Sequence, residues 1–453
     1  MKKALTFHEI RDPIHVFVRL DSDECKVVNS PPFQRLRNIH QLALTYLLYP
    51  GATHRRFEHC LGVMELASKI YDTVTNPAHV HPEMLDLVPR SDDFHHVYWR
   101  RVVRLAALCH DLGHLPFSHA AEDLLPKGTK HESISKAIIL SESMLRIWDE
   151  LKVRPEDVVK VAVGPKYSDQ PLDTWESILY EIIGGDVFGA DRMDYLLRDS
   201  YHAGVAYGRF DHFRLIDTLR ILPKADFGPA QVNQMELALG GLPNNSIQDV
   251  GKSMEPMLGL EQGGIQSAEA LLWARYFMYT QVYMHHVRRI YDVHLADFLR
   301  QWLPGGMFDS DPDGHLRLTD NEVMAAISAA NRDLSSAGHE AAACIASRRH
   351  FRRIYEANPY DKKIRLDAFD RVHNALVKKF GDAHIRKSEF AQKSEGKNFP
   401  VLLSSGDCES SLNVSETLAK VPVFSVGYIY AHLDIRDEAK SWLRTERKAI
   451  LGE

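Results

Sequence analysis

Apolar residues recur at intervals of three and four along much of the chain, the spacing that places them on one face of an α-helix. This spacing predicts a helix over residues 56–74, followed by a polar, His- and Pro-rich connection over residues 76–96. A second helix over residues 98–109 is apolar on nearly every side apart from its arginines, so we expect it to be buried. Gly113 and Pro116 then end it.

The same pattern predicts further helices downstream, separated by turn-forming residues. Thr129 and Glu132 have the spacing of a capping box, which predicts a helix start with His131 in the first turn. Helical segments are predicted over residues 177–198 with a break at 184–185, over 267–302, and from 315 to about 379. Residues 223–262 are rich in Gly, Pro, Asn and Gln, so we expect irregular structure with a short hairpin.

Strand-like segments are concentrated near the C-terminus. Residues 401–403 and 421–426 are short, apolar or β-branched, and bounded by turn residues. The predicted fold class is therefore mainly α, with a smaller α+β C-terminal part. We expect a helical core over residues 1–300 and a C-terminal helical and α+β region over residues 301–453.

The composition is that of an ordinary globular protein. The 453 residues are 45% hydrophobic and 26% charged, and the net charge of −6 gives no reason to expect nucleic acid as a partner. There is no apolar run near the ~20 residues needed to cross a membrane, and the start of the chain lacks a signal peptide's apolar region. We therefore expect a cytoplasmic protein. The five cysteines show no C-x-x-C spacing, so we expect them to be reduced.

Three histidines and an aspartate lie within ten residues of one another at the end of the buried helix. They are His110, Asp111, His114 and His119. Burying a neutral polar group without a partner costs roughly 2–7 kcal/mol. A metal ion with a phosphate ligand would satisfy these groups.

Four residues from three segments could hold one or two metal ions: His59, His110, Asp111 and Asp191. Imidazole and carboxylate ligands suit Mn, Fe, Ni, Co or Zn, with open positions for water, and Mg is also considered. A His-Asp dipeptide alone is common and says little. The sequence around each residue makes the set more specific.

Several short motifs occur together in one order and spacing. They are Gln34-Arg35-Leu36-Arg37, Gln41-Leu42, residues 50–59, residues 109–119, Asp191 to Asp199, Arg275, and Tyr283-Met284-His285. With these motifs the sequence resembles the HD-domain phosphohydrolases, and more narrowly their deoxynucleoside triphosphate (dNTP) triphosphohydrolase branch. The resemblance covers most of residues 8–300. It implies an all-helical catalytic core whose divalent metal is held by His59, His110, Asp111 and Asp191.

The resemblance also implies roles for the nearby histidines. His119 would be the general acid for the departing 5′-oxygen, because imidazole titrates near neutral pH. Glu122, one helical turn further on, would orient it. His114 and His131 correspond to the family's phosphate-facing histidines, and a helix N-terminus at His131 favours anions.

Other positions correspond to the family's substrate contacts. Phosphate contacts are implied for three arginines, and sugar or base contacts for two tyrosines, an aspartate and a glutamine: Arg56, Arg192, Arg275, Tyr195, Tyr283, Asp199 and Gln41. Asp199 with Gln41 would bind the 3′-hydroxyl, and Tyr195 would stack where a 2′-hydroxyl would clash. A single Arg or Tyr on a helix is more often a surface or packing residue, and Tyr283 would also suit the core.

A regulatory nucleotide site is left open. Gln34 and Arg37 match positions at which vertebrate relatives bind a guanine nucleotide, but Asn29 stands where those relatives have a carboxylate. The cluster that includes Arg348 and Arg352 resembles a basic helix that holds activator phosphates. A solvated basic face is the alternative interpretation.

The leading hypothesis is metal-dependent hydrolysis of dNTPs to deoxynucleoside and triphosphate by attack on the α-phosphorus. The implied partners are dNTP substrates, a nucleotide activator and further copies of the chain in a dimer or tetramer. One alternative is an HD phosphohydrolase acting on nucleoside monophosphates, cyclic nucleotides or nucleic-acid ends. Another is a nucleotide sensor or nucleic-acid-binding scaffold whose HD site is structural.

Overall fold

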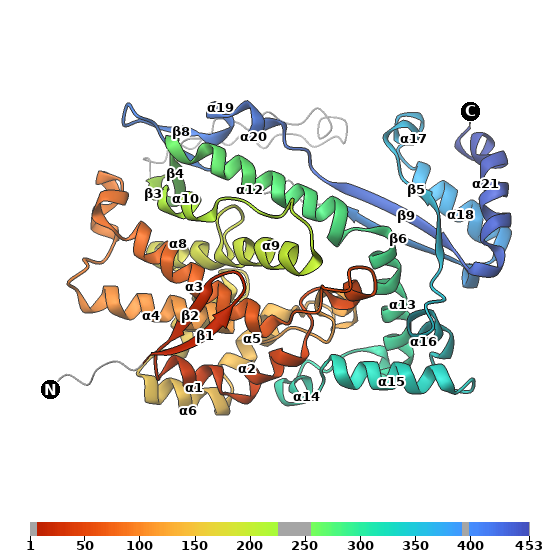
Figure 1. The fold of residues 1–453 in the computed structure, drawn as a ribbon, viewed down its shortest axis with the longest axis horizontal. Helices are drawn as coiled ribbons and strands as arrows, with labels where there is room; N and C mark the ends of the chain where they lie inside the picture. The colour runs from red at the N-terminus through yellow and green to blue at the C-terminus, as the bar shows by residue number, and fades with distance from the viewer. Residues whose placement is uncertain (1–6, 225–254, 392–397, 453) are drawn as a thin grey trace.

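The computed structural model describes residues 7–224, 255–391 and 398–452. The fold is mainly helical, with small sheets, as the sequence predicts. A large helical body occupies the left and centre of Figure 1, and a three-stranded sheet with α18 and α21 lies at the right-hand edge. The helix α13 (His286–Trp302) lies between these two parts.

Two long helices form the middle of the body. The helix α3 (Arg56–Val74) has the predicted bounds and is buried along most of its length. The helix α4 (Phe94–Cys109) begins four residues earlier than predicted, because the Asp93 carboxylate accepts a hydrogen bond from the His95 N–H (2.9 Å) and caps the helix. The body also contains α1 (Glu24–Val28), α2 (Pro31–Arg35), α5 (His131–Ile139), α6 (Glu142–Leu151), α7 (Pro155–Val163), α8 (Thr174–Gly184), α9 (Ala190–Ala203), α10 (His212–Asp217) and α12 (Ile265–Met278).

The described helices after α13 are short or of medium length. They are α14 (Pro312–Leu316), α15 (Asp320–Arg332), α16 (His339–Ala346), α17 (Pro359–Ile364), α18 (Ala368–Phe380), α19 (Ser411–Val414), α20 (Glu416–Lys420) and α21 (Arg436–Leu451). The helical region predicted over residues 267–302 is interrupted between α12 and α13 by a π-helical turn, η7 (Tyr279–Tyr283). π-Helical turns are frequent at functional sites.

In the described ranges, three small sheets accompany the helices. The hairpin of β1 (His8–Asp12) and β2 (Val16–Leu20) was not predicted. A second sheet has the order β3 (Leu219–Pro223), β4 (Pro256–Glu261), β7 (Pro400–Leu402), β8 (Cys408–Ser410), with β4 and β7 parallel. The third is antiparallel, in the order β5 (Arg352–Glu356), β9 (Ser425–Ala431), β6 (Ile385–Ala391).

Several local predictions need correction. The Thr129 capping box is wrong: Lys130 is the N-cap of α5 without a side-chain hydrogen bond, although His131 does stand in the first turn. The strand predicted at 421–426 lies at 425–431, after Pro422, which lacks an N–H for pairing. Most of the irregular segment predicted over 223–262 lies outside the described residues, and its two ends pair as β3 and β4.

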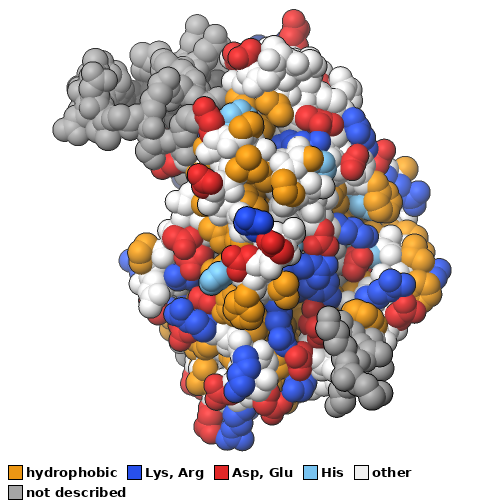
Figure 2. All heavy atoms as spheres, turned by 90° about the vertical axis from the view of Figure 1, so that its left-hand side faces the viewer, with side chains coloured by type: hydrophobic (Ala, Val, Ile, Leu, Met, Phe, Trp, Pro, Cys, Tyr) orange, Lys and Arg blue, Asp and Glu red, His pale blue; other side chains and the backbone are white. Residues whose placement is uncertain are grey.

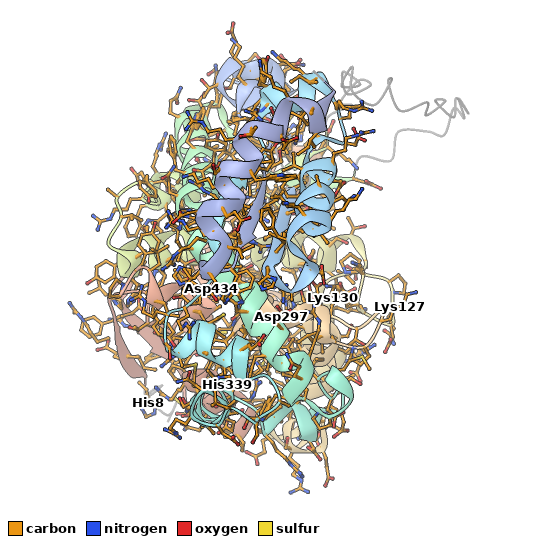
Figure 3. All side chains as sticks on the ribbon, turned by 90° about the vertical axis from the view of Figure 1, so that its right-hand side faces the viewer. His8, Lys127, Lys130, Asp297, His339 and Asp434 are labelled. Carbon is orange, nitrogen blue, oxygen red and sulfur yellow. The ribbon has the colours of Figure 1, made fainter. Side chains whose placement is uncertain are left out.

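The main hydrophobic core continues past residue 300. It joins α3, α4 and α9 to residues such as Phe308 and Ile327. A separate, smaller cluster lies between the third sheet and the helices α18 and α21. Asp297 of α13 links the two parts, because its carboxylate accepts a hydrogen bond from Arg386 of β6 (2.9 Å; Figure 3). The boundary expected at residue 300 stays a prediction.

The surface charge, the helices and the cysteines agree with what the composition predicts. On the face in Figure 2, basic and acidic side chains are intermixed. Within the described residues, no helix combines the length and apolar character that a membrane crossing requires. All five cysteines are free thiols, as predicted.

Candidate metal centre and adjoining cavity

Helix ends bring the predicted metal ligands together. His59 lies in the first turn of α3, His110 and Asp111 follow the last residue of α4, and Asp191 lies in the first turn of α9. His59 Nε2 is 3.0 Å from Asp191 Oδ1 and 3.7 Å from Asp111 Oδ2. His110 Nε2 is 3.8 Å from the same Asp191 oxygen. The structure therefore places all four residues around one point.

This arrangement fits a divalent cation. The ligand atoms of His59, His110 and Asp111 lie within 4.8 Å of one another. His110 Nδ1 donates to the Ala107 carbonyl (2.8 Å), which leaves Nε2 as the free nitrogen. That buried Nε2 has no hydrogen-bond partner among the described residues. Two imidazoles and two carboxylates with one unpartnered nitrogen are a donor set suited to a metal.

Asp194 holds His59 in position and was not selected from the sequence. Its Oδ2 atom accepts a hydrogen bond from His59 Nδ1 (2.8 Å), so Nε2 faces the other ligands. Arg198 binds both oxygens of Asp194 (2.8 and 2.9 Å), and His15 lies 2.7 Å from Oδ1. Asp12 in turn accepts from Arg198 (2.8 Å). The spacing of Asp194 and Arg198, one helical turn apart, was the available signal in the sequence.

The carboxylates also control protonation in the cluster. Burial alone would lower the pKa of His59, but hydrogen bonds to Asp191 and Asp194 raise it to about 10. Burial would raise the pKa of Asp111, but the guanidinium of Arg56 holds it well below its usual value. Asp111 is therefore a charged carboxylate.

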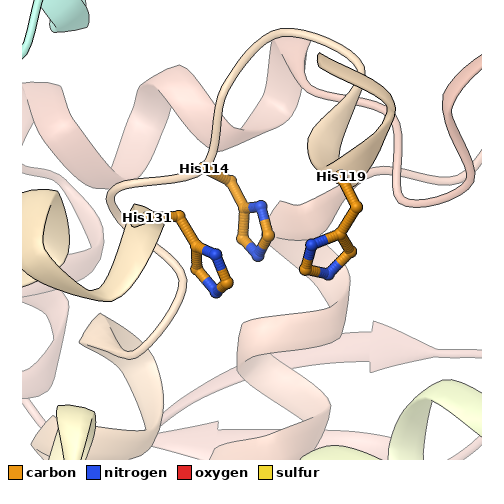
Figure 4. Close-up of side chains that lie close together, drawn as sticks. All are labelled: His114, His119 and His131. Atoms are coloured by element: carbon orange, nitrogen blue, oxygen red, sulfur yellow. The ribbon is translucent and has the colours of Figure 1, made fainter. Parts of the chain in front are cut away.

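Three histidines form a second group beside the first (Figure 4). The rings of His114 and His131 stack at 4.0 Å, and His119 meets them edge-on at 4.8 and 5.1 Å. His114 Nε2 lies 3.2 Å from Asp111 Oδ1, which connects the two groups. Burial holds the pKa of His114 well below its usual value, so its ring is neutral.

Glu122 lies between His119 and His131. Its carboxylate is 2.7 Å from His131 Nδ1 and 3.6 Å from His119 Nδ1. Burial would raise the pKa of Glu122, but these rings lower it and the group stays charged. His119 has 59% of its side chain exposed, so it is open to the cavity. The expected pairing of Glu122 with His119 is therefore a looser contact than its pairing with His131.

A left-handed turn places His119. Phe117 and Ser118 have φ values of 58° and 55°, which cost roughly 1–2 kcal/mol each for residues other than glycine. The buried Asp320 of α15 accepts a hydrogen bond from the Phe117 N–H (2.7 Å) and from the His40 N–H (2.7 Å). Asp320 thus holds this turn in place, and no motif or spacing in the sequence indicated this role.

Gly113 allows α5 to approach the metal centre. A Cβ at this position would collide with the backbone of His131 and Ser135. The Gly113 N–H donates to Ser135 Oγ (2.9 Å), whose hydroxyl donates to the His110 carbonyl (2.8 Å). The glycine therefore sets the distance between the two groups of histidines.

The three histidines of the second group line a cavity of about 730 Å³, together with His110, Asp111 and Asp191 of the first. At another part of its wall are Gln41, Tyr195, Asp199 and Tyr283, whose contacts with a sugar and base stay a prediction. The Tyr283 hydroxyl donates to Asp199 Oδ2 (2.8 Å), and His54 Nε2 lies 2.7 Å from Asp199 Oδ1. The cavity thus combines a candidate metal centre with a separate polar region.

Known families match two parts of the chain. The HD domain matches residues 56–164 and the HD associated region matches residues 251–381. A crystal structure of a hypothetical protein from Aquifex aeolicus is 31% identical, with a TM-score of 0.76 over 97% of this chain and 100% of that one. The chain belongs to the HD-domain phosphohydrolases.

Curated relatives of this HD-domain chain are longer. An uncharacterised protein of Methanocaldococcus jannaschii is 34% identical over 283 residues, which are 62% of this chain and 47% of that protein. The deoxynucleoside triphosphate triphosphohydrolase SAMHD1 of Gallus gallus is 34% identical over 234 residues, 46% of this chain and 36% of that protein. This chain therefore spans less than half the length of these two relatives.

The three arginines expected at phosphate have different surroundings in this HD-domain phosphohydrolase. Arg56 lines the cavity and binds Asp111 and Ser118 Oγ. Arg192 and Arg275 are not among the cavity-lining residues; they contact the carbonyls of Gly185 (3.2 Å) and Asp186 (3.5 Å), respectively. Phosphate binding by Arg192 and Arg275 stays a prediction.

The residues expected at a regulatory nucleotide form two groups. Arg37 Nε donates to Gln34 Oε1 (2.9 Å), and its guanidinium lies over the Phe57 ring. Arg348 binds the Leu47 carbonyl (3.2 Å), and Arg352 lies in β5. The prediction that Arg348 and Arg352 lie on a helix is therefore wrong, because this segment is a turn followed by the strand β5. Their regulatory role stays a prediction.

Proposed function

We propose that this HD-domain phosphohydrolase converts dNTPs to deoxynucleosides and inorganic triphosphate. The observation that supports the proposal is the single cavity, which has the His–Asp cluster on one wall and Gln41, Asp199 and Tyr283 on another. Its volume of about 730 Å³ lies within the range for ligand sites. The similarity to a protein named as a dNTP triphosphohydrolase adds the substrate class.

In the proposed reaction, the residues of the cavity have different roles. A divalent cation held by His59, His110, Asp111 and Asp191 would activate water and neutralise phosphate charge. His119, open to the cavity, gives a proton to the departing 5′-oxygen as the bond to the α-phosphorus breaks. Glu122 holds His131, and through it the ring stack, in position.

The polar region suits a deoxyribose. Gln41 Oε1 is buried and has no hydrogen-bond partner within the part of the chain that the structure describes, so it can accept from a 3′-hydroxyl bound beside Asp199. The rings of Tyr195 and Tyr283 meet edge-on at 6.1 Å beside it. In the proposed arrangement, Tyr195 occupies the space that a 2′-hydroxyl would need.

Product analysis tests the proposal. The protein is incubated with Mn²⁺ or Mg²⁺ and the four dNTPs, singly and in pairs, and the products are separated by chromatography. Tripolyphosphate and deoxynucleosides are expected. Intact dNTPs would refute the proposal, whereas orthophosphate from monophosphates or a linearised cyclic nucleotide would indicate another HD phosphohydrolase activity.

Variants test the assigned roles. His110→Ala with Asp111→Ala should abolish turnover, whereas a scaffold or sensor would keep its function. His119→Gln should lower kcat about 10²- to 10⁴-fold with a dNTP, but far less with bis(p-nitrophenyl) phosphate, in which p-nitrophenolate leaves in place of the 5′-oxygen and needs no proton. His95→Gln, an exposed histidine on α4, is the matched control and should leave turnover unchanged.

Activation and assembly are proposed on the resemblance alone. We propose that a second nucleotide activates the enzyme and that it works as an oligomer. A pair of dNTPs should then be hydrolysed faster than either alone, and light scattering should show a mass above that of one chain. Additive rates and a monomer would refute this part without affecting the reaction.

A further inference from the structure

One wall of the cavity is formed by residues that the proposed reaction does not use. Arg288, Arg289 and Asp292 of α13 line it, together with Phe390 of β6 and Tyr279 of η7. The rings of Tyr279 and Phe390 stack at 5.8 Å. This wall therefore combines an aromatic surface with a buried acid and two guanidinium groups.

Hydrogen bonds join this wall to the sugar region, and α13 also packs against η5 (Ser118–Leu124), the segment that carries His119. Asp191 and Asp199 are eight residues apart on α9, which is about 12 Å along the helix axis. Tyr283 binds Asp199, and Arg288 Nη1 donates to the Tyr283 carbonyl (2.6 Å). A nucleotide with its phosphates at Asp191 and its sugar at Asp199 would present its base to α13.

Asp292 is a buried carboxylate without hydrogen-bond partners in the described part of the chain. Its side chain is only 8% exposed, yet neither carboxylate oxygen accepts a hydrogen bond from any described residue. Arg288 and Arg289 lie 3.4 and 3.7 Å from Oδ2 and balance the charge, and Arg288 Nε also lacks a hydrogen-bond partner in the described ranges. Buried polar groups are costly when unpaired, and a carboxylate would repel phosphate. A ligand group with hydrogen-bond donors would satisfy these oxygens.

We propose that this wall selects guanine, which rests on the proposed function and adds the base to it. Guanine presents two neighbouring donors, N1–H and the 2-amino group, which match the two oxygens of Asp292. Its O6 and N7 are acceptors for a guanidinium such as Arg288. Thymine has a single N–H between two carbonyls, and adenine and cytosine place an acceptor nitrogen beside the amino group. Guanine alone satisfies both oxygens of the carboxylate.

Competition between nucleotides tests the base preference. An equal mixture of the four dNTPs, in which every candidate activator is present, gives relative kcat/KM values from the rates of depletion. We expect dGTP to be preferred about 5- to 150-fold, the range for one good bidentate pair. The analogue dITP lacks the 2-amino group and should be about tenfold poorer than dGTP, through the loss of one hydrogen bond to a charged group.

A substitution then assigns the preference to Asp292. In Asp292→Asn the ratio of dGTP to dITP should fall to about one, and dXTP should improve, because the amide N–H can donate to the 2-carbonyl of xanthine. Asp297→Asn is the matched control on the same helix, since Asp297 binds Arg386 and Arg300 and is not among the residues that line the cavity. It should keep the wild-type ratio.

Binding separates this proposal from the proposed function. Calorimetry in EDTA compares dGTP, dITP and dATP without turnover, for wild type and for both variants. Equal affinity for the three nucleotides, or an unchanged ratio in Asp292→Asn, would overturn guanine selection even if every dNTP is hydrolysed. Tight binding of dGTP that depends on Asp292, with no triphosphate released, would support guanine selection and refute the proposed reaction.

Discussion

Replacing Asp194 with Asn tests whether the orientation of His59 sets metal affinity. The carboxylate is fully buried, and its Oδ2 atom accepts the His59 Nδ1 hydrogen bond at 2.8 Å. Asn has the same shape but no charge, and its amide nitrogen cannot accept a hydrogen bond. Loss of such a partner to a metal-ligating histidine typically costs 10- to 100-fold in affinity. We expect a loss of about 1.4–2.7 kcal/mol in metal binding.

The same change should also destabilise the fold. Arg198 is fully buried and binds both oxygens of Asp194, so Asp194→Asn leaves a buried guanidinium with a neutral partner. Breaking a buried ion pair from one side costs about 3–5 kcal/mol. Because Asp12 still binds Arg198, the expected loss in the free energy of unfolding is at the lower end of this range.

Asp12→Asn is the matched control. Asp12 binds Arg198 from the opposite side and has no bond to His59. It should therefore lower the free energy of unfolding by a similar amount while keeping the metal affinity of the wild type. Urea unfolding gives the first quantity, and competition of Mn²⁺ or Co²⁺ with a chelator gives the second.

Two results for the metal affinities of Asp194→Asn and Asp12→Asn would refute this reasoning. If Asp194→Asn keeps the wild-type affinity to within about twofold, well inside the expected 10- to 100-fold, the hydrogen bond to His59 does not control the metal site. If both variants weaken metal binding equally, general destabilisation accounts for the loss.

Two further predictions concern stability and the turn before His119. Burial raises the pKa of Glu181 to about 7 from 4.5, so stability should fall as pH rises from about 4.5 to 7, where the unfolded chain loses a proton that the folded protein keeps. In Glu181→Gln the side-chain oxygen still accepts the Leu258 N–H. The variant should be more stable than the wild type above pH 7 by up to about 3 kcal/mol, with no gain below pH 4.5. Equal urea midpoints for the variant and the wild type at pH 8 would contradict this. Asp320→Ala should lower the free energy of unfolding by about 2–6 kcal/mol, from roughly 1–3 for each buried N–H that loses its acceptor. It should also lower kcat while metal affinity holds, because Phe117 and His40 lose the carboxylate that holds the turn. Retained kcat in a folded Asp320→Ala protein would contradict the role given to this turn.

The sequence predicted those parts of the site that depend on local pattern. The period of α3 placed His59 on a buried helix, the apolar character of α4 placed His110 at the end of another, and the motif around Asp191 supplied the fourth candidate ligand. Asp194 was missed because its role depends on which face of α9 meets α3. Asp320 was missed because it reaches Phe117 across 203 positions of sequence. Long-range contacts of this kind leave no periodic signal.

Two segments that depend on tertiary pairing, β5 and the hairpin β1–β2, were predicted wrongly or missed. Arg352 and Arg353 lie in a run of charged and polar residues that suits a solvated helix, yet this run pairs with β9 as β5. Strand propensity depends strongly on packing against neighbouring strands, which the local sequence does not show. The hairpin β1–β2 was missed for the same reason, although its turn carries His15 to Asp194.

These contacts show that the HD domain alone does not complete the site. Residues 56–164 contribute His59, His110 and Asp111, but Asp191 and Asp194 come from α9, beyond that region. The HD associated region contributes Tyr283 and Asp320, one at the sugar region and one behind the His119 turn. Since each makes a buried or half-buried hydrogen bond to a residue outside its own segment, displacing either segment would alter the cavity. The associated region is therefore a structural part of the site, and a fragment limited to residues 56–164 would lack a metal ligand and the carboxylate that orients His59.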